Sequence, residues 1–192
     1  MEYSRNSTAN TLRLPSRELH LMILEATLMA SIAITSLVGN GLVCVVIYRT
    51  NTLRRVTNCY IVALSCAGIL MASLDMPLIV AILYNGEWIY GEFLCNLQGF
   101  TGLVLSMGTQ LMIGMTAVNR YVCILKPNMY RRWFSIKSSV RTIICGWISA
   151  VVTLAIPYAA GYSKFRFHVR KACCFIILKT KSLMQLTQLL LC

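Results

Sequence analysis

Apolar residues in this chain form long blocks and do not alternate with polar ones. Four stretches are nearly free of charge: Ala26 to Tyr48, Val56 to Gly86, Phe93 to Asn119 and Thr142 to Ser163. Each reaches the roughly 20 residues that a helix needs to cross a hydrocarbon core of about 30 Å. Only helices and closed barrels satisfy their own backbone hydrogen bonds in lipid. The pattern predicts an all-α, multi-pass membrane protein, a bundle of four transmembrane helices.

Composition agrees with this prediction. The chain has 192 residues, of which 57% are apolar and only 12% are charged. In a typical soluble domain, about a quarter of the residues are charged. The chain is therefore not an ordinary soluble domain.

The basic residues behind the net charge of +12 are unevenly distributed among the loops between the apolar stretches. Basic residues crowd the first and third loops between the apolar stretches: Arg49, Arg54, Arg55, Arg120, Lys126, Arg131, Arg132, Lys137 and Arg141. The second loop holds only Glu87 and Glu92. The positive-inside rule places the first and third loops in the cytoplasm and the N-terminus outside. We therefore expect a plasma-membrane protein in contact with lipids, and not a nucleic-acid-binding protein.

The two ends of the chain lie outside the predicted bundle. We expect residues 1–20 to form an extracellular tail, in which Asn6-Ser7-Thr8 is a glycosylation acceptor. The four-helix membrane region covers residues 21–163, and residues 164–192 form an outer loop followed by a truncated or divergent tail. Basic residues are abundant after the fourth stretch: Lys164, Arg166, Arg170, Lys171, Lys179 and Lys181. Either the earlier loops fix the topology and these charges are tolerated, or this segment is not the native continuation.

Catalytic and metal-binding patterns are absent from the sequence. The chain has nine cysteines but only two histidines, with no CxxC, no HExxH and no Gly-rich phosphate loop. Within spans, a free thiol behaves as a small apolar residue. We therefore expect no enzyme activity, no bound metal and no cofactor.

Polar, glycine, proline and aromatic residues mark the apolar stretches at characteristic intervals. They are Gly39-Asn40, Leu64-Ser65, Pro77, Trp88, Cys95, Asn119-Arg120-Tyr121, Trp147 and Pro157. Their order and spacing resemble the rhodopsin-like (class A) G-protein-coupled receptors over residues 20 to 175. The interval of 25 residues between Cys95 and Arg120 is the most specific feature. The resemblance implies four helices of a seven-helix receptor fold. Asn40, Trp147 and Pro157 would then be helix-packing residues.

Within the family, Asn119-Arg120-Tyr121 in place of Asp-Arg-Tyr is similar to the melatonin receptors, as is Gly99-Phe100 after Cys95. The sequence Ile156-Pro157-Tyr158 lacks the Asn that follows the corresponding Pro in those receptors. The resemblance therefore indicates a melatonin-receptor-like orphan, with an unknown small-molecule or peptide ligand.

The same resemblance implies a role for the third apolar stretch in coupling. Arg120 would hold the inactive state and then contact the heterotrimeric G protein, with Tyr121 beside it. Asn119 is neutral and offers Arg120 a hydrogen bond in place of an ion pair. We expect a looser inactive state than the family's usual ion pair provides.

Candidates for the ligand pocket are Asp75, Gly102 and Met107. Asp75 is an acid deep within a span, where charged groups are costly and usually functional. Gly68 stands where the family carries its sodium-binding Asp, so the usual sodium site is not expected. Gly102 stands where amine receptors carry an acid, and glycine cannot form that ion pair. Methionines such as Met107 are most simply core residues.

By resemblance, Cys95 pairs with Cys173 or Cys174, and Phe175 favours Cys173 because the family often has an aromatic two residues after this Cys. We also expect five glycines to be points of close helix packing: Gly39, Gly41, Gly99, Gly108 and Gly114. Trp88 and Trp147 are expected to serve in packing.

Two functions remain open from the sequence. The first is a G-protein-coupled receptor, or a fragment of one, that signals across the plasma membrane and can form receptor dimers. The second is a truncated, non-signalling four-helix protein that associates with full-length receptors. A channel or transporter subunit is disfavoured because no row of polar residues lines any stretch.

Overall fold

The computed structural model describes residue 14 and residues 18–50, 56–168 and 172–178. The elements are α2 (Leu19–Arg49), α3 (Val56–Leu70), the π-helical turn η2 (Met71–Asp75), α4 (Met76–Asn85), α5 (Gly91–Leu125), α6 (Pro127–Trp133), α7 (Ile136–Ala159), β1 (Ser163–His168) and β2 (Cys173–Leu178). Asn6 and the basic residues at 170, 171, 179 and 181 lie outside the described residues.

Four helical segments of the described chain are long and apolar enough to cross a membrane: Leu19–Arg49, Val56–Asn85, Gly91–Leu125 and Ile136–Ala159. The predicted all-α membrane bundle is confirmed. The helices extend beyond the uncharged stretches, so that α5 includes Arg120 and α7 includes Lys137 and Arg141. Long basic side chains at helix ends can reach the headgroup layer, and charge therefore does not mark a helix end.

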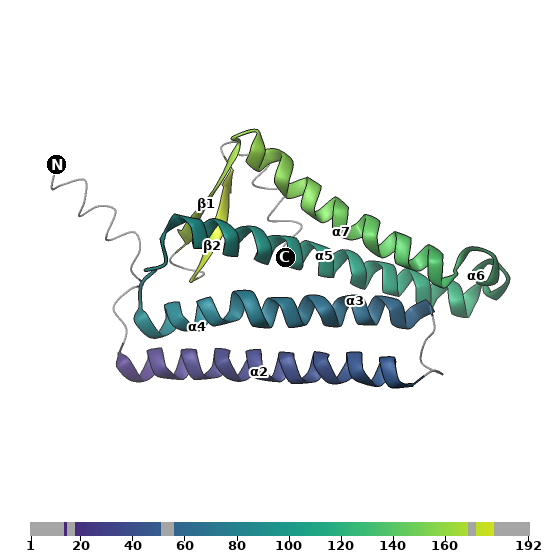
Figure 1. The fold of residues 1–192 in the computed structure, drawn as a ribbon, viewed down its shortest axis with the longest axis horizontal. Coiled ribbons are helices and arrows are strands. Elements are labelled where there is room, and N and C mark those ends of the chain that lie inside the picture. Colours follow the sequence, from purple (N-terminus) through teal and green to yellow (C-terminus); the bar gives the residue numbers. More distant parts are fainter. Residues whose placement is uncertain (1–13, 15–17, 51–55, 169–171, 179–192) are drawn as a thin grey trace.

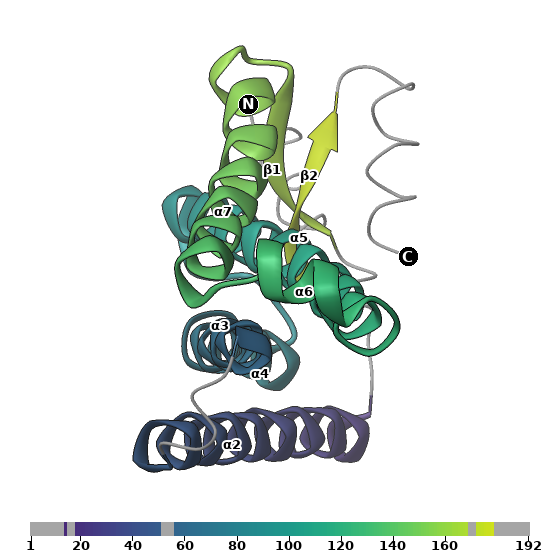
Figure 2. The same cartoon turned by 90° about the vertical axis from the view of Figure 1, so that its right-hand side faces the viewer.

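The helices lie side by side in the order α2, α3 with α4, α5 and α7 (Figures 1 and 2). α5 is central, because it contacts α3, α6, α7 and both strands. The strands lie near the start of α5, and α6 lies near its end (Figure 1). We call these two ends of the bundle the hairpin end and the α6 end.

The strands β1 and β2 form an antiparallel hairpin, which the hydrophobic pattern of the sequence does not predict. Phe165 pairs with Ile176 and Phe167 with Cys174, and these side chains are buried or half-buried. Lys164, Arg166 and His168 alternate with them and are exposed. A strand places successive side chains on opposite faces, so the hairpin covers α5 with one face and exposes basic groups on the other.

The hairpin adds an apolar core to this end of the bundle. Leu103 and Val104 of α5 pack with Leu154 of α7 and with Phe165 and Ile176 of the two strands. These contacts fix the hairpin to both α5 and α7.

Candidate functional sites at the two ends of α5

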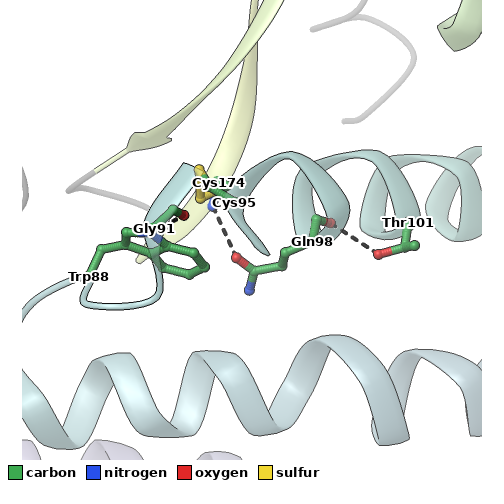
Figure 3. Close-up of a disulfide and its surroundings, with 6 residues drawn as sticks. All are labelled: Trp88, Gly91, Cys95, Gln98, Thr101 and Cys174. Carbon is green, nitrogen blue, oxygen red and sulfur yellow. Dashed lines mark hydrogen bonds between the residues drawn. A yellow bond between two sulfur atoms is a disulfide. The ribbon is translucent and has the colours of Figure 1, made fainter. Parts of the chain in front are cut away.

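A disulfide joins Cys95 of α5 to Cys174 of β2 (Figure 3). Of the two expected partners, the bridge uses Cys174, and the preference for Cys173 is wrong. Cys174 is 3% exposed and lies opposite Phe167 on the inner face of the hairpin, whereas Cys173 lies opposite the exposed His168. Strand alternation decides between neighbouring cysteines, and the strand was not predicted.

Trp88 closes the hairpin end from the side of α4. Its indole Nε1 donates a hydrogen bond to the carbonyl oxygen of Gly91 at 2.9 Å (Figure 3). Its ring stacks on Phe167 with a centroid distance of 5.8 Å. Trp88 therefore connects the turn before α5 to the hairpin by packing.

Asp75 and Gly102, two of the three candidates for the ligand pocket, lie together between η2 and α5. The Asp75 carboxylate is buried, and its Oδ1 accepts a hydrogen bond from Thr101 Oγ1 at 3.1 Å. A Cβ built on Gly102 would lie 3.5 Å from the same oxygen. Met107 is not part of this group, because it packs against the core cluster that includes Leu154.

The space beside Gly68 is filled by a side chain from α2. A Cβ at Gly68 would lie 2.6 Å from Asn40 Nδ2. That nitrogen donates to the carbonyl oxygen of Ser36 at 2.8 Å and to Ser36 Oγ at 3.1 Å. The Asn40 amide therefore occupies the space next to Gly68 while its hydrogen bonds stay within its own helix.

At the α6 end, Asn119 is fully buried. Its Oδ1 accepts a hydrogen bond from Thr57 Oγ1 of α3 at 2.8 Å, and its Nδ2 has no partner among the described residues. Arg120 and Tyr121 are both exposed. The sequence predicts a hydrogen bond from Arg120 to Asn119, whereas the donor in the structure is Thr57, which the sequence does not indicate. The helices α3 and α5 are thus connected beside the exposed arginine.

Trp147 packs where α7 crosses α5. A Cβ on Gly108 would overlap its ring. Gly99 makes a similar close contact with Phe165. A Cβ at Gly39, Gly41 or Gly114 would meet no described atom within 4 Å, so these three are not points of close packing among the described residues.

Pro157 lies near the end of α7, where the N–H of Tyr162 donates to the carbonyl oxygen of Pro157 at 3.0 Å. No cluster of three His, Cys, Asp or Glu that could hold a metal occurs within the described ranges.

Three polar residues at these sites were not singled out from the sequence: Thr57, Gln98 and Thr101. Gln98 is buried, and its Oε1 accepts a hydrogen bond from the backbone N–H of Cys174 at 3.4 Å. A polar side chain within an apolar span must find a partner, and this signal was present in the sequence. Thr101 also bonds backbone carbonyls of its own helix, so its second role could not be inferred from the sequence.

The sequence profile of the family described as "7 transmembrane receptor (rhodopsin family)" matches residues 39–192. The chain therefore belongs to the rhodopsin family of seven-transmembrane receptors. Members of this family are multi-pass membrane receptors, which agrees with the family expected from the sequence.

Individual relatives are distant. The chain is 28% identical to G-protein coupled receptor 161 of Danio rerio, over 81% of this chain and 30% of that protein. It is 27% identical to octopamine receptor beta-3R of Drosophila melanogaster, over 86% of this chain and 14% of that protein. It is 30% identical to the D(1A) dopamine receptor of Didelphis virginiana, over 78% of this chain and 34% of that protein. The chain spans about a third or less of the length of these relatives.

Proposed function

We propose that the chain acts in a plasma-membrane receptor that binds an extracellular small-molecule or peptide ligand and couples to a heterotrimeric G protein. The hairpin end lies outside the cell, and the α6 end lies in the cytoplasm. In this proposal residues 1–20 form the extracellular tail with a glycan on Asn6, residues 21–163 the membrane region and residues 164–192 the outer loop and tail.

The observation that carries the proposal is the length of α5 between its two functional ends. The interval of 25 residues from Cys95 to Arg120 is helical throughout. At 1.5 Å per residue it spans roughly 37 Å, which exceeds the hydrocarbon core of about 30 Å. The disulfide and the arginine therefore lie at opposite surfaces of one bilayer.

Charge supports the direction of this crossing. The described basic residues Arg49, Lys126 and Lys137 lie at the α6 end, whereas Glu87 and Glu92 lie at the hairpin end. The positive-inside rule places the more basic end in the cytoplasm. A disulfide is also expected on the extracellular side, where thiols are oxidised.

The proposed coupling surface is Arg120 with Tyr121, which are exposed next to the buried Asn119–Thr57 hydrogen bond. The residues Asn119-Arg120-Tyr121 and Gly99-Phe100 favour a melatonin-receptor-like orphan as the subtype. The names of the relatives reported above point to other ligands, octopamine and dopamine among them. No contact among the described residues favours the non-signalling alternative.

Topology is the first test. One epitope tag is placed at the N-terminus and another within the α6 connection, and intact and permeabilised cells are stained. We expect the N-terminal tag to stain in intact cells and the second tag only after permeabilisation. Staining of both tags in intact cells would contradict the proposal.

Coupling is the second test. The protein encoded by the natural transcript is expressed in cells, and dissociation of each class of heterotrimeric G protein is measured by energy transfer. Arg120→Ala should reduce dissociation by roughly tenfold or more, because hydrogen bonds to charged groups contribute about 1.5–3 kcal/mol. Lys126→Ala, at the end of the same helix, is the matched control and should leave dissociation within about twofold. Equal loss in both variants, or no dissociation with any G protein, would refute coupling.

A further inference from the structure

Asp75 is a buried acid in the interior of a membrane span. It is 3% exposed and lies ten residues before Asn85, the last residue of α4. At 1.5 Å per residue this places it about 15 Å from the hairpin end of the span. An acid at such depth is costly unless a polar or charged group compensates it.

The described residues compensate Asp75 only in part. Thr101 donates one hydrogen bond to Oδ1, and Oδ2 has no partner among the residues described. No Lys, Arg or His within the described ranges forms an ion pair with this carboxylate. A carboxylate can accept about four hydrogen bonds, so most of its capacity is unused.

The π-helical turn directs Asp75 towards α5. The turn ends at Asp75, and the backbone N–H of Met76 donates to the carbonyl oxygen of Met71. Pro77 comes directly afterwards and has no N–H to continue the α-helical pattern. The extra residue in the turn rotates α4 relative to a regular continuation of α3, and such turns occur often at functional sites.

The residue that faces Asp75 on α5 has no side chain. A Cβ on Gly102 would meet only Asp75, with Oδ1 at 3.5 Å and Cγ at 3.8 Å. Any larger side chain at residue 102 would extend towards the carboxylate. The glycine therefore leaves the space beside the carboxylate to another group.

A second unsatisfied polar group lies about one turn nearer the hairpin end. Gln98 is 4% exposed, and its Nε2 has no partner among the described residues. Figure 3 shows this amide nitrogen on the side of Gln98 that faces the neighbouring helix. Gln98 precedes Thr101 and Gly102, the two α5 residues next to Asp75, by three and four residues, which is a rise of about 4.5–6 Å along α5.

We propose that Asp75 binds the ammonium group of a small cationic ligand, for which Gly102 leaves room, and that Gln98 donates to an acceptor of the same ligand. The proposal rests on the receptor function above and specifies its ligand class. Residue 102 of α5 is a glycine and carries no acid, so the negative charge at this place comes from Asp75 on the facing segment. Pairing an ammonium group with this buried carboxylate offsets the cost of desolvating both charges, because the interior screens their attraction weakly.

Thermal unfolding of the protein encoded by the natural transcript, purified in lipid nanodiscs, tests this proposal. The probes are 2-phenylethylamine, tyramine and tryptamine, each paired with the neutral alcohol in which a hydroxyl replaces the amine. A probe at a hundredfold excess over its dissociation constant should raise the midpoint by roughly 5 °C or more. We expect at least one amine to do so and its alcohol to fail.

Three variants assign the effect to the site. Asp75→Asn keeps the shape of the side chain and should abolish the amine-specific shift. Glu92→Gln removes an exposed acid near the start of α5 and should leave the shift unchanged. The double variant Asp75→Asn with Gly102→Asp moves the carboxylate across the interface and should restore the shift at least in part.

Several results would overturn the proposal: equal shifts with amine and alcohol, no shift with any amine, or a shift retained in Asp75→Asn. It would also be overturned if NaCl without amine raised the midpoint as much as the amine does, relative to the same concentration of KCl.

If Asp75→Asn does not fold, Gly102→Ala replaces it. Its Cβ sits at ordinary contact distance from Asp75, so the variant should fold yet bind the amine at least tenfold more weakly. An amine shift without G-protein dissociation would refute the receptor function alone, and dissociation without an amine shift would refute the site alone.

Discussion

The two longest helices of the chain, α2 and α5, differ in how they are packed. α2 has 31 residues and is the more apolar of the two, yet only Ala26 and Ala33 are buried. α5 has 35 residues, of which ten are buried, including the polar Gln98 and Asn119. Among the described residues, the more hydrophobic helix is therefore the less buried one.

This difference reflects the solvent. In lipid, an apolar side chain gains little by contacting another helix, because the acyl chains are equally apolar. Close approach and hydrogen bonds decide packing instead, and α5 provides both through Gly99, Gly108, Gln98 and Asn119. Hydrophobicity predicts which segments cross the membrane, and small and polar residues predict which of them pack together.

The largest expected effect comes from removing the disulfide that fixes the hairpin to α5. Cys174→Ser opens a loop with a sequence separation of 79 residues. The chain-entropy estimate for a loop of this size is about 4 kcal/mol. We expect a fall of several degrees or more in the unfolding midpoint, measured in nanodiscs, and a marked loss of surface expression, measured in cells.

Cys173→Ser is the matched control, one residue away on the other face of β2. It should retain the disulfide and most of the stability. If Cys173→Ser destabilised the protein as much as Cys174→Ser, the observed pairing would be wrong, and the sequence-based preference for Cys173 would be restored.

The next largest effect tests close packing within α5. Gly108→Ala places a methyl group where the Trp147 ring lies, and overpacking of this kind costs about 1–3 kcal/mol. Gly114→Ala is the control on the same helix, since its Cβ meets no described atom within 4 Å. It should be neutral or stabilise by up to about 1 kcal/mol, because alanine favours helix more than glycine. Unfolding midpoints of both variants measure the contrast, and equal values would remove the distinction between packed and open faces of α5.

The sequence predicted the parts of this fold that hydrophobicity and spacing determine. The four spans follow from the lengths of the apolar stretches, and the interval from Cys95 to Arg120 indicated the receptor fold. The hairpin was missed because each strand has only six residues and those of β2 are all apolar, without the alternation that marks a half-buried strand. The choice between Cys173 and Cys174 failed for the same reason.

The contacts within the candidate sites were predictable only in part. Asp75 was identified because acids are rare in spans, and Asn119 was identified from the resemblance of Asn119-Arg120-Tyr121 to a family motif, but their partners Thr101 and Thr57 were not. Threonine is common in membrane helices, where its hydroxyl usually bonds its own backbone, as Thr116 does to Met112 at 2.7 Å. Only the geometry of the neighbouring helix shows which threonine bonds elsewhere.

A smaller effect is expected at the α6 end, where α3 and α5 share one hydrogen bond. Thr57→Val keeps the shape of the side chain and removes the donor to Asn119 Oδ1. A net hydrogen-bond contribution of about 0.5–1.5 kcal/mol corresponds to a two- to tenfold increase in ligand-independent G-protein dissociation.

Asn119→Asp should lower ligand-independent dissociation, because a carboxylate can form an ion pair with Arg120 and still accept a hydrogen bond from Thr57. Basal activity above the parent in Asn119→Asp would contradict the looser inactive state.

The smallest effect is expected where α2 meets α3, and it tests whether this interface is as loose as the burial indicates. Gly68→Ala brings a Cβ to 2.6 Å from Asn40 Nδ2, a contact nearly as close as that between Gly108 and Trp147. The group that must move is the Asn40 amide, the end of a flexible side chain that is hydrogen-bonded only to Ser36 of its own helix. The group next to Gly108, by contrast, is the rigid ring of Trp147.

Losing the hydrogen bonds between Asn40 and Ser36 costs about 1 kcal/mol, and the higher helix propensity of alanine offsets this cost. The unfolding midpoint of Gly68→Ala should therefore lie within about 2 °C of the parent, and adding Asn40→Ala should remove any remaining deficit that the contact causes. A fall in Gly68→Ala as large as that in Gly108→Ala would mean that α2 is packed as tightly as α5, and that low burial does not report a loose helix in this protein.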